Sequence, residues 1–255
     1  MVQPGKVRLQ HDPSVTSSTS PVDKSDGHSD PLPTDALAIN ADARMPTEPD
    51  DGFGQLWRKR YRLRLDGATI SSAEAISYWR EHYGEFWPEG NRFYAPIAGL
   101  QEGEVALADL EMPGGTRLST GVIVAGVDDS SFRFVTPQSH AFAAIITFSA
   151  YPESGIPVAQ VEIVMRAMDP LFDLGLMFGG HRREDRFWLE TLAALGKSVG
   201  VQTLPQMESE ILDRRRHWRK AGNIVRNAYI RTGLYMMARP FRRLAGWVQP
   251  RSEST

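Results

Sequence analysis

The chain has 255 residues, of which 41% are apolar and 24% charged, a composition that suits one sizeable core with appendages. The absence of cysteine excludes disulfides, cysteine nucleophiles and thiolate metal sites. The longest run of small or apolar residues, 141–150, is far shorter than the roughly 18 residues that cross a bilayer. No signal-type segment opens the chain, so we expect a cytoplasmic protein.

The net charge of −2 conceals a strong asymmetry along the chain. Residues 214–251 contain 11 Lys or Arg and no Asp or Glu, which leaves 18 basic residues elsewhere against all 31 acidic ones. An acidic body with a basic tail predicts an anionic partner, either a membrane surface or a nucleic acid.

Three segments follow from the composition. Residues 1–52 contain no aromatic residue but seven prolines, six serines and nine Asp or Glu, so we expect a disordered acidic arm. The folded domain is predicted over 53–203, and residues 204–255 form the basic tail.

The domain opens with a strand and a helix. Residues 61–66 alternate strictly between apolar and polar side chains, which indicates a half-buried strand. Ser71 and Glu74 then form a capping box at the start of a helix. Ile76, Trp79 and Tyr83 follow at helical spacing.

Six further strands are predicted between turn-forming sequences. They cover about 92–97, 104–111, 116–125, 131–135, 142–151 and 158–167. In the last of them one face is apolar and the other polar, which is typical of an antiparallel sheet with one wet face.

A long helix closes the domain. Asp169 is a plausible N-cap, Pro170 occupies the favoured first position, and the helix is predicted to run to about Lys197. Gly179 and Gly180 lie in its middle, where they should weaken or kink it.

The order of these elements, with Asp169-Pro170 opening the last helix, resembles the helix-grip (SRPBCC) superfamily of START domains, polyketide cyclases and birch-pollen-allergen-like proteins. The resemblance covers about residues 61–200 and implies an α+β fold, in which a curved seven-stranded antiparallel sheet wraps around the long C-terminal helix. It further implies an apolar cavity between them that binds a lipid, a polyketide or another hydrophobic small molecule. A cyclase or dehydratase acting in the same cavity is the alternative function.

Catalytic candidates are few. His140 titrates near neutrality and could form a dyad with Asp109 or Asp185, although a histidine in a turn more often caps a strand end. His181 and Asp185 share a helix face but lack a third ligand, and nearby arginines oppose a cation, so no metal site is expected. The simpler interpretation is an exposed face of paired charges. The glycine pairs 114–115 and 179–180 do not fit a nucleotide fingerprint, and no cofactor is predicted.

Several apolar positions are predicted to face inward. They line a ligand cavity if the resemblance holds, and otherwise they are ordinary core. They are Phe93, Leu118, Val122, Phe148, Ile163, Met165, Phe178 and Trp188.

The tail carries the sharpest pattern. Residues 206–248 are predicted to form one or two amphipathic helices whose apolar face holds Trp and Tyr and whose opposite face holds arginines, as in interfacial membrane helices. Docking on the acidic body is the alternative interpretation, and nucleic acid is disfavoured because no known binding motif accompanies the charge. The residues predicted to contact the membrane or another anion are Arg214, Arg215, Arg216, Trp218, Arg219, Lys220, Arg226, Tyr229, Arg231, Tyr235, Arg242, Arg243 and Trp247.

Overall fold

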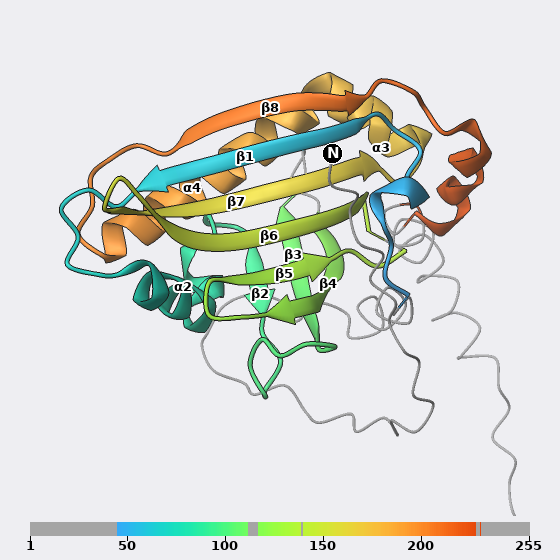
Figure 1. Ribbon diagram of the computed structural model, residues 1–255. Coiled ribbons are helices and arrows are strands. Elements are labelled where there is room, and N and C mark those ends of the chain that lie inside the picture. The colour runs from blue at the N-terminus through green and yellow to red at the C-terminus, as the bar shows by residue number, and fades with distance from the viewer. Residues whose placement is uncertain (1–44, 112–116, 139, 228–229, 231–255) are drawn as a thin grey trace, which may run out of the picture. The chain divides into compact units, whose positions relative to one another are not determined.

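The computed structural model describes residues 45–111, 117–138, 140–227 and 230. Its centre is a curved antiparallel sheet of eight strands in the order β2-β3-β4-β5-β6-β7-β1-β8 (Figure 1). The strands are β1 (Leu56–Arg64), β2 (Arg92–Tyr94), β3 (Val105–Glu111), β4 (Arg117–Val127), β5 (Ser131–Val135), β6 (Phe142–Glu153), β7 (Ile156–Ala167) and β8 (Gln206–Asp213). The seven strands expected from the sequence are all present, and β8 is an addition.

Two groups of helices lie at opposite ends of this sheet (Figure 1). The first group is α2 (Ser72–Glu81) with the 3-10 helix η2 (Tyr83–Phe86). The second holds α3 (Pro170–Gly175), the π-helical turn η4 (Leu176–Gly180) and the 3-10 helices η1 (Pro49–Asp51) and η5 (Trp218–Arg226). The predicted capping box starts α2: the amide of Glu74 donates to Ser71 Oγ at 3.2 Å, and the Glu74 carboxylate accepts from the Ser71 amide at 2.8 Å.

The long helix is present and is kinked where the glycine pair predicts it. Asp169 caps it by accepting from the amides of Leu171 and Phe172. The helix then passes through α3 and η4 into α4 (His181–Ser198). Phe178 and Gly179 leave helical geometry, and Gly179 adopts φ +106°, a conformation that side chains beyond glycine rarely reach. The predicted interruption is therefore confirmed as a π-turn between two helices.

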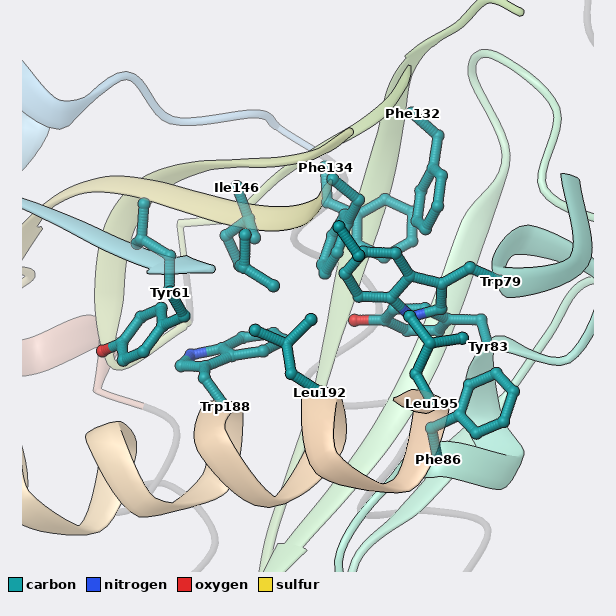
Figure 2. Packing of buried hydrophobic residues seen from close by; sticks show 14 of the residues in the cluster. Tyr61, Trp79, Tyr83, Phe86, Phe132, Phe134, Ile146, Trp188, Leu192 and Leu195 are labelled. Carbon is teal, nitrogen blue, oxygen red and sulfur yellow. The ribbon is translucent and has the colours of Figure 1, made fainter. Parts of the chain in front are cut away.

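The core fills the space between the concave face of the sheet and α4, which we call the interior. Trp188, Leu192 and Leu195 project from α4 toward the strands, and Trp79 and Tyr83 enter from the α2 end (Figure 2). Aromatic rings meet there edge-to-face or stacked, with centroids 4.6–6.1 Å apart. This order of strands around a long C-terminal helix confirms the expected helix-grip fold of the α+β class.

Two boundaries differ from the sequence prediction. Residues 206–213 were expected to be helical, but they form β8 and pair with β1 from Leu56↔Asp213 to Arg62↔Gln206. Their alternating sequence, with Met207, Ser209 and Ile211 on one face, fits the free edge of β1 better than it fits a helix. At the other boundary the fold starts before residue 53, because Thr47 exchanges hydrogen bonds with Thr136, and η1 follows.

Candidate functional site at the kink of the long helix

Asp109, one of the three predicted catalytic residues, lies on the convex face of the sheet and outside the interior. It follows from the register that Asp109 shares its face with Tyr94 and Ser119, whereas Ala108 and Phe93 face inward. Its carboxylate accepts from Ser119 Oγ at 2.7 Å and from the Tyr94 hydroxyl at 3.3 Å. Asp109 is thus a buried structural acceptor, and its predicted role inside a cavity is wrong.

His140 is also held in a structural role. Its Nδ1 accepts from the amide of Phe142 at 3.1 Å, next to the start of β6. Burial lowers the pKa of His140 to about 4, so the ring is neutral at physiological pH. The carboxylates of Asp109 and Asp185 make their hydrogen bonds with other residues, and the predicted dyad does not form.

A buried cluster of ionisable side chains lies where α4 begins, on the interior side of β1. Lys59 Nζ, with the side chain 2% exposed, donates to Glu184 at 2.9 Å and to Asp185 at 2.6 Å. The Tyr61 hydroxyl donates to the same Asp185 oxygen at 2.8 Å. His181 stacks on Trp57 with ring centroids 4.5 Å apart. We call Lys59, Tyr61, His181, Glu184 and Asp185 the Lys59 cluster.

Burial dominates the electrostatics of the Lys59 cluster. It raises the pKa of Glu184, partly offset by Lys59, and raises the pKa of Tyr61, whose ionisation the two carboxylates oppose further. It also lowers the pKa of His181 to about 4, with a further lowering by the Lys59 ammonium. His181 Nδ1 is buried 4.0 Å from Glu184 Oε2 and makes no hydrogen bond within the described ranges. The cluster holds one cation between two acids and leaves one imidazole nitrogen unused.

This cluster corrects the sequence interpretation of the helix face. Glu184 and Asp185 were expected to pair on the surface with Arg182 and Arg186, but they turn inward to Lys59. The signal is present in the strand, whose alternation extends back from Tyr61 to Trp57. A strand that starts at residue 61 leaves Lys59 off the inward face.

Above the cluster, the kink exposes an apolar surface. Leu171, Leu174, Met177 and Phe178 are 42–82% exposed, with Phe178 the most exposed at 82%. Phe178 was predicted to line the interior, and this is wrong because the π-turn rotates it outward. The other predicted lining positions are buried or half-buried in the packed interior: Phe93, Leu118, Val122, Phe148, Ile163, Met165 and Trp188.

The tail docks beside this surface through its polar side chains. Arg216 Nε donates to Asp173 at 2.7 Å, and Lys220 Nζ donates to Asp51 at 2.8 Å. The Asn227 amide donates to Asp169 Oδ2 at 2.7 Å. The acidic partners agree with the expected docking on the body.

The apolar side chains of η5 are turned away from the body. Trp218 is 73% exposed and Val225 75% exposed. Arg216 Nη2 contacts Met177 Sδ at 3.6 Å, so η5 and the kink share one end of the sheet (Figure 1). We call Leu171, Leu174, Met177, Phe178, Trp218 and Val225 together the apolar end. The remaining predicted contact residues Tyr229, Arg231, Tyr235, Arg242, Arg243 and Trp247 lie outside the described residues.

None of the helices in the described part of the chain combines the length and the hydropathy needed to cross a membrane. Within the same residues, no group of three or more His, Asp or Glu side chains is placed to hold a metal ion.

Comparisons with known proteins give a likeness of fold. No family model matches the chain, and no curated protein matches it. Among solved structures, protein TTHA0849 from Thermus thermophilus is 14% identical with a TM-score of 0.44, over 56% of this chain and 96% of that one. The di-domain ARO/CYC protein StfQ from the steffimycin biosynthetic pathway is 14% identical with a TM-score of 0.44, over 59% and 51%. The major latex-like protein 151 from Panax ginseng is 11% identical with a TM-score of 0.37, over 58% and 99%. They agree with the expected helix-grip resemblance at the level of the fold.

Proposed function

We propose that the protein binds reversibly to anionic lipid surfaces through its apolar end. The observation that carries this proposal is the orientation of η5. A helix that merely completes a globular fold buries its apolar side chains, whereas η5 docks by Lys220 and Asn223 and leaves Trp218 and Val225 exposed. Phe178 and Met177 extend the same exposed surface from the kink. Apolar patches of this kind on a folded domain mark sites of interaction.

The charges around the apolar end favour a lipid over a neutral apolar partner. Arg214, Arg215 and Arg219 are exposed on the segment that leads into and through η5. Each basic side chain near an anionic bilayer contributes about 1 kcal/mol, and the tryptophan and phenylalanine rings suit the headgroup boundary. Attachment of this kind is reversible, since exposed charges are screened by salt.

Sedimentation with vesicles tests the proposal. We expect the full chain to pellet with vesicles of phosphatidylcholine mixed with phosphatidylglycerol, and to pellet less as salt rises. The double substitution Phe178→Ala/Trp218→Ala should lower the partition coefficient by about tenfold or more, because two rings lose their burial in the interface. The folded state should be unaffected, since both side chains are exposed.

Ile97→Ala is the matched control. Ile97 is 86% exposed in the segment after β2 and is not part of the apolar end, so its loss should leave sedimentation unchanged. Equal losses from both variants, or no pelleting of the unmodified chain at low salt, would contradict the proposal.

A second candidate function is binding of an apolar small molecule in the interior. Ala108 and Thr120 face each other across β3 and β4 on the inward side, both 3% exposed. Thr120 Oγ1 is buried and has no hydrogen-bond partner in the described ranges. A buried hydroxyl without a partner is costly, and a ligand carbonyl or hydroxyl would satisfy it. The aromatic rings near α2 already fill the other part of the interior.

Native mass spectrometry of the purified chain, with and without added hydrophobic molecules, tests this candidate. We expect Thr120→Val to retain less ligand while the ligand-free variant gains thermal stability, because the unpaired hydroxyl is gone. A ligand recovered unchanged supports a binding module. Conversion that His181→Asn abolishes would support the enzymatic alternative, with the Lys59 cluster as its acid–base groups. Failure to retain any ligand from a broad panel would rule this candidate out.

A further inference from the structure

A hollow at the start of η5 adds a specific feature to the apolar end. Five consecutive residues, Arg216 to Lys220, line this hollow, whose volume is about 700 Å³. Four of the five carry a cationic or titratable basic side chain, and the fifth is the exposed Trp218. Its wall meets the kink where Arg216 contacts Met177. Phe53 supports the hollow from behind, with its ring 5.2 Å from that of Trp218 in an edge-to-face contact.

Two of the cations are held in place by carboxylates yet keep unused donors. Arg216 is fixed by one hydrogen bond from Nε to Asp173, and a guanidinium has five N–H groups. Lys220 is fixed by one hydrogen bond to Asp51, and an ammonium has three N–H groups. Arg219 is exposed and forms no ion pair with any described carboxylate. The nearest acids, Asp51, Asp173 and the Arg166-bound Asp213, therefore position the cations without saturating them.

We infer that this hollow binds the terminal phosphate of a phosphomonoester lipid headgroup; the inference rests on the proposed binding to anionic lipid surfaces and names the headgroup. A terminal phosphate carries close to two charges and three acceptor oxygens, and so it can accept from Arg216, Arg219 and Lys220 together. A phosphodiester headgroup offers one charge, and a serine headgroup adds an ammonium that the arginines repel. The exposed Trp218 ring beside the hollow suits the boundary between headgroups and acyl chains.

Vesicles matched in total charge test the inference. Phosphatidylcholine vesicles would contain phosphatidic acid, phosphatidylglycerol or phosphatidylserine, in amounts that equalise the surface charge. We expect the full chain to bind the phosphatidic acid vesicles about fivefold more tightly or better, the gain from one additional charge contact. Soluble glycerol 3-phosphate should compete selectively with that binding, and inorganic phosphate should compete more weakly because it lacks the glycerol and the acyl chains.

Arg219→Gln and Arg182→Gln form a matched pair of variants. Both side chains are exposed arginines, but Arg182 lies on α4 and does not line the hollow. Arg219→Gln should abolish the preference for phosphatidic acid, whereas Arg182→Gln should keep it. Equal binding to all three matched vesicles would overturn the inference and leave the lipid-surface proposal standing. Absence of binding to every vesicle would overturn both, and binding of glycerol 3-phosphate without any vesicle binding would assign the hollow to a soluble phosphate.

Discussion

Lys59→Met is expected to lower the free energy of unfolding by about 3–5 kcal/mol, because it leaves Glu184 and Asp185 as unpaired acids in a buried site. Methionine fills most of the volume of lysine, so the loss is electrostatic rather than steric. Urea denaturation followed by circular dichroism measures the difference.

Two further variants make this result interpretable. Arg58→Met removes a neighbouring cation whose ion pair with Glu210 is partly solvated, and it should cost at most about 1 kcal/mol. The triple variant Lys59→Met/Glu184→Gln/Asp185→Asn should recover much of the loss, since no net charge then remains buried. A Lys59→Met protein as stable as its Arg58→Met counterpart would show that the cluster is open to water.

Trp79→Ala should be comparably damaging, with a loss of about 3–5 kcal/mol from the cavity that it opens in the interior. Trp79 is fully buried, and its ring meets those of Phe132 at 6.1 Å and Phe148 at 5.4 Å. Trp79→Phe should cost less, because it keeps an aromatic ring and removes an indole N–H that has no partner in the described part of the chain. Thermal and urea unfolding would give both values.

Trp218→Ala provides the contrast within the same chain. Trp218 is 73% exposed, so its removal should change stability by less than about 1 kcal/mol while weakening attachment to vesicles. If Trp79→Ala and Trp218→Ala proved equally harmless, the close packing of rings around α2 would be contradicted.

Local patterns carried most of the fold prediction. The period-two alternation of the strands, the capping box at Ser71 and the cap at Asp169 each depend on a few neighbouring residues, and the structure has each of them. The kink at Gly179 was predictable for the same reason. The end of the last β-strand was not, because β8 forms only when β1 offers it an edge, and the two strands are far apart in sequence.

The candidate site was predictable only in part. The apolar and basic character of the tail was evident from sequence, and the exposure of Trp218 agrees with it. Which side of η5 meets the body depends on distant acids such as Asp51 and Asp173, which no local periodicity reveals. The Lys59 cluster joins a strand to a helix more than 100 residues later, and a lysine inside a basic run gives no local sign of burial.

The eighth strand has a consequence for how this protein can vary or be engineered. The Arg166 guanidinium, 2% exposed, donates to the carbonyls of Gly54 and Arg215 and to the Asp213 carboxylate. Two of these three acceptors belong to the segment that leads from β8 into η5. Exchanging or cutting the chain at residue 203 would therefore strand a buried cation and strip the edge of β1. The end that meets the lipid and the strand that completes the sheet are inherited as one unit, so the affinity of that end can be tuned one side chain at a time but not replaced as a module.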